Sequence, residues 1–112
     1  MKKIEAVIRE EKLEALKEKL ESSGFIGMTV FKVKGRGNQG GIYLEWRAGN
    51  YKVDMLPKLM LMMVVKDEDV ERVIDIISET CSTNSEGDGK IFISPIDDVV
   101  RIRTKEKGEK AL

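Results

Sequence analysis

Apolar and polar residues alternate in the first third of the chain in a way that predicts a strand, a helix and a second strand. Residues 4–9 place isoleucine or alanine at every second position, which is typical of a strand with one buried face. From residue 11 onward leucines recur at every third or fourth position, on one face of a helix that Gly24 ends. Residues 28–34 are rich in β-branched and aromatic side chains, so they are predicted to form the second strand.

The pattern repeats in the second half of the chain. Residues 59–65 form a continuous apolar run, as expected of a central strand covered on both faces. Acidic residues 67–69 begin a helix whose apolar positions recur from Val70 at i+3, i+4 and i+7. A glycine-containing turn then leads to a strand at residues 90–94 that Pro95 interrupts, and the ordered core is expected to end with a last extended segment.

This order of elements predicts an α+β fold of the ferredoxin-like, split βαβ type (βαββαβ), with an antiparallel sheet and two helices on one face. Residues 1–112 are expected to form one domain, since so short a chain has little material for a second core. Two helices cover only one face of such a sheet, yet residues 59–65 are apolar on both sides. The other face is therefore expected to pack on other copies of the chain in a compact homo-oligomer.

The composition of the chain excludes several classes of function. Twenty basic and twenty acidic residues cancel, so the chain lacks the positive field on which nucleic-acid-binding proteins usually depend. The longest apolar run is too short to cross a membrane and the N-terminus has no signal-peptide block, which favours a cytoplasmic location. Histidine is absent and Cys81 is the sole cysteine, which removes Ser-His and Cys-His catalysis and most zinc sites. We therefore expect a protein that is not an enzyme.

A glycine-rich segment follows the second predicted strand. Residues 35–40 match the dinucleotide fingerprint G-x-G-x-x-G, but no helix pattern follows them, as that site requires. The remaining alternatives are a flexible hinge and a ligand loop of another kind. Residues 37–55 then show little periodicity and include several aromatic side chains, so we expect a long protruding loop that contacts a partner. A β-hairpin extension is the alternative.

Residues 87–90, in the order Gly-Asp-Gly-Lys, place two glycines and a lysine at the entry to a strand. Backbone N–H groups can approach a phosphate there while the lysine adds positive charge. Arg101 and Arg103, expected on one face of a strand, offer guanidinium groups suited to phosphate oxygens. The three basic residues together favour a polyphosphate ligand, although residues 87–90 alone could equally be a turn with an exposed lysine.

Five short motifs are shared with a known family. They are Gly-Met-Thr-Val at 27–30, Val-Lys-Gly-Arg-Gly at 33–37 with Gln39 after it, Asp-x-Leu-Pro-Lys at 54–58, Gly-Asp-Gly-Lys-Ile-Phe at 87–92 and Arg-Ile-Arg-Thr at 101–104. In these motifs, and over essentially all 112 positions, the sequence resembles the PII signal-transduction family. More narrowly it is similar to the GlnK-type members that partner ammonium channels, and residues 35–42 are similar to archaeal members.

The resemblance implies a homotrimer with ATP or ADP in each cleft between neighbouring subunits. Residues 87–90 and the two arginines would hold the nucleotide, and Thr29 and Val64 would line the adenine pocket. The implied nucleotide-binding residues are Thr29, Gly37, Asn38, Gln39, Val64, Gly87, Asp88, Gly89, Lys90, Arg101 and Arg103.

The resemblance also implies that 2-oxoglutarate binds beside the ATP phosphates through Mg²⁺. Gln39 would be the metal ligand and Lys58 would pair with the distal carboxylate. The implied 2-oxoglutarate-binding residues are Gly37, Gln39, Gly40, Gly41 and Lys58. A dianionic keto acid beside a triphosphate is repelled unless a divalent cation bridges the two, so the metal would make the ligands cooperative.

The long loop would carry the signal to a partner. An ammonium transporter is the favoured partner, through which the protein would lie peripherally at the membrane, and glutamine synthetase and nitrogenase are alternatives. Arg47 is the candidate for plugging a channel pore, and Tyr51 stands where some relatives are uridylylated or adenylylated. A slow ATPase is the enzymatic alternative. Many bacterial members have other residues at the positions of Asn38, Asn84 and Ser85. The phosphate contacts that those members make there therefore do not carry over directly to this chain.

Overall fold

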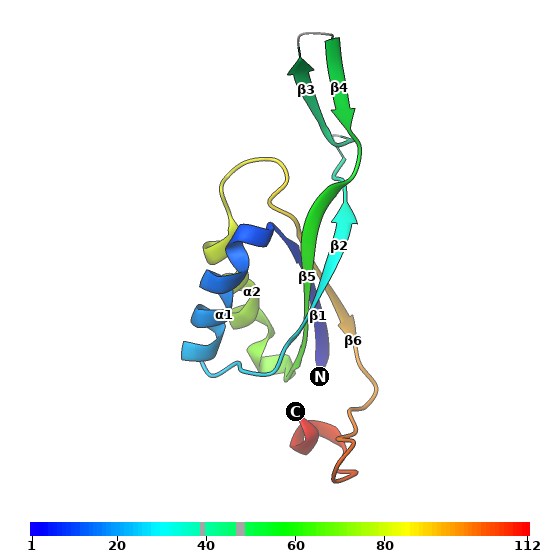
Figure 1. Cartoon of the computed structure of the whole chain (residues 1–112). Coiled ribbons are helices and arrows are strands. Elements are labelled where there is room, and N and C mark those ends of the chain that lie inside the picture. The colour runs from blue at the N-terminus through cyan, green and yellow to red at the C-terminus, as the bar shows by residue number, and fades with distance from the viewer. Residues whose placement is uncertain (39, 47–48) are drawn as a thin grey trace.

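The computed structural model describes residues 1–38, 40–46 and 49–112 (Figure 1). The strands are β1 (Lys2–Ile8), β2 (Thr29–Gly35), β3 (Ile42–Trp46), β4 (Gly49–Val53), β5 (Leu56–Val65) and β6 (Lys90–Pro95). The helices are α1 (Leu13–Ser22) and α2 (Val70–Cys81). A 3-10 turn precedes each helix, at Glu10–Lys12 and Asp67–Asp69, and a third occupies Gly108–Ala111. Within the described part of the chain, no helix is long and apolar enough to span a bilayer.

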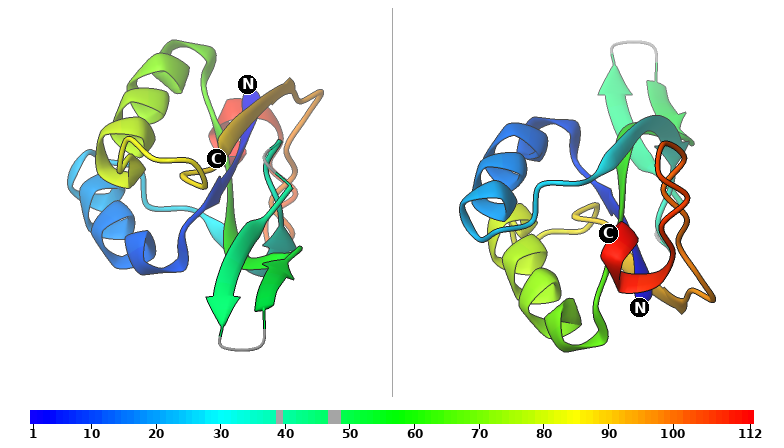
Figure 2. Two further views of the ribbon diagram at one scale, coloured as in Figure 1. Left: turned by 90° about the horizontal axis from the view of Figure 1, so that it is seen from above. Right: turned by 90° about the horizontal axis from the view of Figure 1, so that it is seen from below.

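Four strands form the main sheet, in the order β2-β5-β1-β6 with every neighbouring pair antiparallel. Figure 2 shows both helices on the same side of this sheet. The arrangement is an α+β, ferredoxin-like fold, which confirms the predicted fold class. β1 lies in the interior of this sheet, and its isoleucine and alanine positions are buried on the helical side, as their alternation predicts.

The core lies between the sheet and the two helices. Every second residue is buried there from Ile4 onward in β1 and from Leu59 onward in β5, as the period-two pattern predicts. The buried apolar residues are Ile4, Ala6, Ile8, Leu16, Leu20, Leu59, Leu61, Met63, Val65, Val73, Ile76, Ile77 and Cys81. Cys81 is thus a core residue, and burial raises the pKa of its thiol.

The segment 37–55 contains a β-hairpin, which is the alternative to an irregular loop. Strands β3 and β4 pair with each other from Ile42 opposite Val53 to Trp46 opposite Gly49, in a separate two-stranded sheet. The hairpin projects beyond the main sheet (Figure 1), and the chain measures 59 Å along its longest axis against 24 and 21 Å across. The structure therefore keeps the expected protrusion but gives it regular strands.

The face of the main sheet opposite the helices carries exposed aromatic side chains. The strand register aligns Phe31 with Met60 and Val7, and aligns Met62 with Glu5 and then Phe92. Phe31 is 41% exposed and Phe92 53% exposed, although both lie on strands. An apolar strip, interrupted by Glu5, thus crosses this face, as the two-sided apolar pattern of residues 59–65 predicts.

Residues 99–103 do not form a strand, so the prediction that Arg101 and Arg103 share a strand face is wrong. The C-terminal segment turns back on itself: Lys105 donates its backbone N–H to the carbonyl of Arg101 at 2.8 Å, and Val100 forms an isolated bridge with Lys107. Lys105 has a φ of 61°, a turn conformation. Alternation of Arg, Ile and Arg could not reveal this, because Ile102 is 96% exposed and has no core to face. Pro95 likewise ends β6 rather than interrupting it.

Candidate functional site

The turn between α2 and β6 depends on two glycines. Gly87 and Gly89 have φ values of 92° and 104°, a backbone conformation that residues with a Cβ rarely adopt. At Gly89 a Cβ would also lie 1.7 Å from the carbonyl oxygen of Val7. The chain therefore passes directly over the end of β1, and only glycine permits that approach.

Asp88 closes the loop that precedes the turn. Its carboxylate accepts hydrogen bonds from the hydroxyl of Thr83, from the backbone N–H of Thr83 at 2.7 Å and from Nε of Arg9 at 3.2 Å. The Thr83 hydroxyl first, and then the Thr83 backbone and Arg9, hold the pKa of Asp88 well below its usual range. The carboxylate is thus ionised near neutral pH and is engaged by its own chain.

Two cationic side chains, from the end of β1 and from β5, lie against this turn. Arg9 donates through Nη2 to the carbonyl of Glu86 at 2.8 Å, and Lys58 donates through Nζ to the carbonyl of Gly87 at 2.5 Å. Lys58 is only 8% exposed. Burial, and then repulsion by Arg9, lower the pKa of Lys58, while Glu11 and Asp88 oppose that shift. Carbonyl and carboxylate oxygens of the turn therefore offset the repulsion between the two positive charges.

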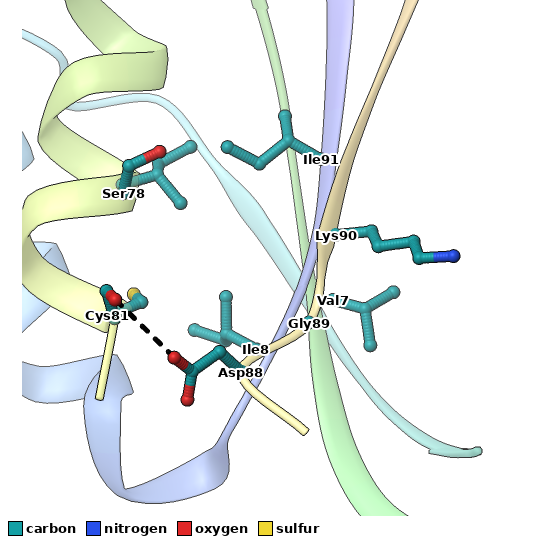
Figure 3. A pocket seen from close by; sticks show the side chains of 10 residues that line it. Val7, Ile8, Ser78, Cys81, Asp88, Gly89, Lys90 and Ile91 are labelled. Atoms are coloured by element: carbon teal, nitrogen blue, oxygen red, sulfur yellow. Dashed lines mark hydrogen bonds between the residues drawn. The ribbon is translucent and has the colours of Figure 1, made fainter. Parts of the chain in front are cut away.

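Lys90 lies at the start of β6, beside this network. Figure 3 shows its side chain directed away from a pocket of about 320 Å³ that Cys81, Ile91 and Asp88 help to line. The register places Lys90 opposite Val7, on the face away from the helices. Its ammonium group is exposed there and can meet an anionic ligand.

Thr29 and Val64 lie on that same open face. Thr29 is opposite Met62, and Val64 is two residues further along β5 and opposite Lys3. Thr29 is exposed, and Val64 alternates with buried Met63 and Val65. Both thus lie on the face of the sheet opposite the helices.

Arg101 and Arg103 lie in the C-terminal segment, at the far end of β6 from the glycine turn (Figure 1). Arg101 forms an ion pair with Glu106 at 3.7 Å and donates to the carbonyls of Lys110 and Leu112, each at 3.4 Å. One chain therefore does not bring these arginines to Gly87–Lys90. A site that uses both sets must combine residues of two copies.

The glycines before the hairpin form a tight turn. The N–H of Gly40 donates to the carbonyl of Gly37 at 3.0 Å, and Gly40 and Gly41 have φ values of 79° and 97°. Asn38 is exposed in this turn. An ion pair between Arg36 and Asp54 joins the two ends of the protruding segment.

Two predicted site residues, Gln39 and Arg47, lie outside the described residues. Tyr51 belongs to β4, where its backbone is opposite Leu44. Lys58 lines a second pocket, of about 280 Å³, with Lys32, Lys34 and Glu10. Among the residues that the structure describes, no group of three or more His, Cys, Asp or Glu side chains could hold a metal ion.

Sequence reasoning missed Arg9, Thr83 and the ion pair between Arg36 and Asp54 as parts of the site. Arg9 stands on the polar side of a predicted strand, and Asp88 is 79 positions away from it. Only the tertiary fold joins the two residues. The position of Arg9, directly after the last strand residue Ile8, is the sole local signal.

Comparison with known proteins gives the same family over the whole length. The family described as Nitrogen regulatory protein P-II matches residues 1–106. Nitrogen regulatory protein P-II 2 of Methanothermobacter thermautotrophicus is 53% identical over 112 residues, which are 100% of this chain and 97% of that protein. Nitrogen regulatory protein P-II 1 of the same organism is 54% identical over the same shares of both chains. Nitrogen regulatory protein P-II of Azospirillum brasilense is 47% identical over 100% of both chains.

Proposed function

The chain belongs to the nitrogen regulatory P-II family, and on that premise we propose that it senses ATP or ADP together with 2-oxoglutarate and controls a partner protein through residues 37–55. The relatives are named as regulatory proteins, in agreement with a role in nitrogen signalling. In this proposal the protein binds its ligands and does not turn them over.

One contact carries the proposal. Lys58, the residue expected to pair with 2-oxoglutarate, donates a hydrogen bond to Gly87, the first residue of the turn expected to hold phosphate. These two positions are 29 residues apart in the sequence. A metabolite and a nucleotide bound to these residues would therefore be neighbours, as a sensor that couples them requires.

We infer that the working unit is a homotrimer with ATP or ADP in each cleft between subunits. The apolar strip with Phe31 and Phe92 would be covered by other copies, which would remove its aromatic surface from water. Lys90 of one subunit and Arg101 and Arg103 of a neighbour would then meet the phosphates. This arrangement also gives a reason for the separation of the two basic sets along one chain.

The metabolite would bind at the base of the hairpin. We propose that Gln39 supplies a ligand to Mg²⁺, and that phosphate and 2-oxoglutarate oxygens supply the others. Lys58, Lys32 and Lys34 line one pocket with a single carboxylate, that of Glu10, so the pocket is net positive, which suits a dicarboxylate. Binding there would bias the position of the hairpin relative to the sheet.

The proposed output is contact with an ammonium transporter, and glutamine synthetase and nitrogenase are the alternatives. A hairpin that projects far beyond the sheet can enter a groove or pore that the body of the protein cannot reach. Arg47 would supply a positive charge near its tip, and Tyr51 is the candidate modification site. Association with a transporter would bring the cytoplasmic protein to the membrane surface.

Isothermal titration calorimetry tests the sensing function. ATP and ADP should bind without 2-oxoglutarate, whereas 2-oxoglutarate should bind only when ATP and Mg²⁺ are both present. Equal binding of 2-oxoglutarate without nucleotide and metal would contradict the bridge. Pull-down from source cells under the same ligand conditions then identifies the partner and the sign of the response.

A further inference from the structure

We propose that Arg9 is a positioning residue for the nucleotide-binding turn. It acts through Asp88 and the carbonyl of Glu86, and it fixes the shape in which Gly87–Lys90 meets phosphate without itself needing to touch the ligand. This inference rests on the proposed function, because it concerns the same turn.

The guanidinium group of Arg9 spans the turn. Nε donates to Asp88 at 3.2 Å and Nη2 donates to the carbonyl of Glu86 at 2.8 Å, so the two contacts lie on either side of Gly87. A Cβ at Gly87 would be only 3.1 Å from Nη2, so the side chain lies directly against that glycine. A planar fork with fixed donor directions holds two acceptors at a set separation, which a flexible ammonium does not.

Asp88 transmits this restraint to the preceding loop. It accepts from both the backbone N–H and the hydroxyl of Thr83, while Ser82 also approaches it at 3.5 Å. One carboxylate thus ties the start of the loop, the turn and the end of β1 together. Its presence is otherwise unexpected, since a negative charge beside a polyphosphate site opposes ligand binding.

Restraint matters here because the turn is rich in glycine. Without Arg9 and Asp88, Gly87 and Gly89 would sample many backbone conformations, and ligand binding would have to order them. Lys58 also holds the turn, through its hydrogen bond to the Gly87 carbonyl. The side chains of the sheet therefore order the turn before any ligand arrives.

The direction in which Asp88→Asn changes the affinity for ADP distinguishes a positioning role from a purely electrostatic effect. Asp88→Asn removes a negative charge beside the proposed phosphate site, so electrostatics alone predicts tighter binding of ADP. Positioning predicts the reverse, because the neutral amide cannot accept from both Thr83 and Arg9 as the carboxylate does. Titration of ADP in the presence of EDTA excludes any metal contribution.

We expect Arg9→Met and Asp88→Asn each to weaken ADP binding by about tenfold or more, with non-additive losses in the double variant. Binding of adenosine, which has no phosphate, should stay within about twofold of wild type. Thr83→Val should weaken ADP binding less, and in the same direction, because the backbone N–H of Thr83 still reaches Asp88.

Arg72→Met is the matched control. It also removes one arginine, but Arg72 packs over the ring of Phe25 and donates to the carbonyl of Ser23, at the other end of the helical layer (Figure 1). It should leave ADP affinity unchanged. Circular dichroism melting and measurement of the oligomeric state confirm that each variant is folded. If Arg9→Met does not fold, Asp88→Asn and Thr83→Val decide the question.

Unchanged ADP affinity in Asp88→Asn, or tighter binding, would overturn the positioning role. An equal loss of adenosine and ADP binding would also overturn it, since that loss would reflect general damage to the site. If the wild-type protein binds ADP and the variants bind it equally well, the proposed function survives and only this inference fails. If the wild-type protein does not bind ADP, both fail.

Discussion

The turn at residues 83–90 and the base of the hairpin at residues 35–41 are both rich in glycine, yet the structure supports them very differently. Arg9, which directly follows β1, Lys58 of β5 and Thr83 of the loop itself hold the first region through their side chains. At the second, the pairing of β2 with β5 ends at Gly35, and the contacts described beyond it are one backbone hydrogen bond and the exposed ion pair of Arg36 with Asp54. We infer that the glycines of the turn permit one fixed backbone conformation, whereas the glycines at the hairpin base permit the backbone to change conformation.

The largest effect is expected for Gly89→Ala, which would disrupt the restrained turn. The added Cβ would lie 1.7 Å from the Val7 carbonyl oxygen, at a φ of 104°, so the turn or β1 must move. We expect a loss of about 3 kcal/mol or more in the free energy of unfolding and loss of ATP binding. Urea denaturation measures the stability. Gly27→Ala is the control, since its Cβ meets no atom within 4 Å, and equal stability of the two variants would refute the close approach.

The second prediction concerns Gln39 at the hairpin base. Gln39→Ala should weaken 2-oxoglutarate binding by about 100-fold, roughly 2.8 kcal/mol, because it removes the proposed protein ligand of the bridging Mg²⁺. Affinity for ADP should change by less than about threefold, because ADP binding does not depend on that bridge. Calorimetry with each ligand measures both values. A parallel loss of ADP and 2-oxoglutarate binding would mean that the two regions are not separate in function.

The third prediction uses the pH dependence of Asp88. Its pKa in the folded protein lies below the ordinary value of 3.8, so the unfolded state binds the proton more readily. The stability that the carboxylate contributes is thus present at neutral pH and is lost as the pH falls below about 4 through the folded-state pKa. The difference in the free energy of unfolding between wild type and Asp88→Asn should be largest near pH 7 and should narrow toward pH 2. A difference that is constant over this range would exclude the carboxylate as its source.

The smallest effect is expected at the ion pair that joins the two ends of the hairpin. Arg36→Ala should change the free energy of unfolding by less than about 1 kcal/mol, because both side chains of the pair are half exposed. It should nevertheless weaken binding of the partner protein, since the hairpin would lose one of its attachments to the sheet. Thermal melting and a pull-down with the partner separate the two effects. A loss of stability as large as that of Gly89→Ala would show that the base is as rigid as the turn.

Periodicity sufficed to predict the main sheet and both helices. The alternation in β1 and the continuous apolar run in β5 correspond to strands with one and two apolar faces, and each helix buries the stripe that its sequence predicts. Two segments could not be predicted in this way. The hairpin has no core to impose a pattern, and the segment after Pro95 is held by its own turns, so Arg101 and Arg103 were wrongly placed on a strand.

The candidate site also has one part that the sequence predicts and one part that it does not. Its glycine turn is visible as a motif, since Gly87 and Gly89 are needed for local backbone reasons. Its supporting side chains are not visible, because Arg9 and Asp88 meet only after β1 and β6 pair. The sequence therefore reveals the glycine turn of the candidate site more readily than the side chains that hold it in shape.

Hydrogen–deuterium exchange tests the contrast between the two regions most directly. We predict that, without ligand, a peptide covering residues 82–90 exchanges more slowly than one covering residues 36–55, because an isolated two-stranded hairpin is marginally stable in water. Addition of ATP, Mg²⁺ and 2-oxoglutarate should slow exchange mainly in residues 36–55. Fast exchange of residues 82–90 before ligand addition, at a rate equal to that of residues 36–55, would contradict a preformed turn.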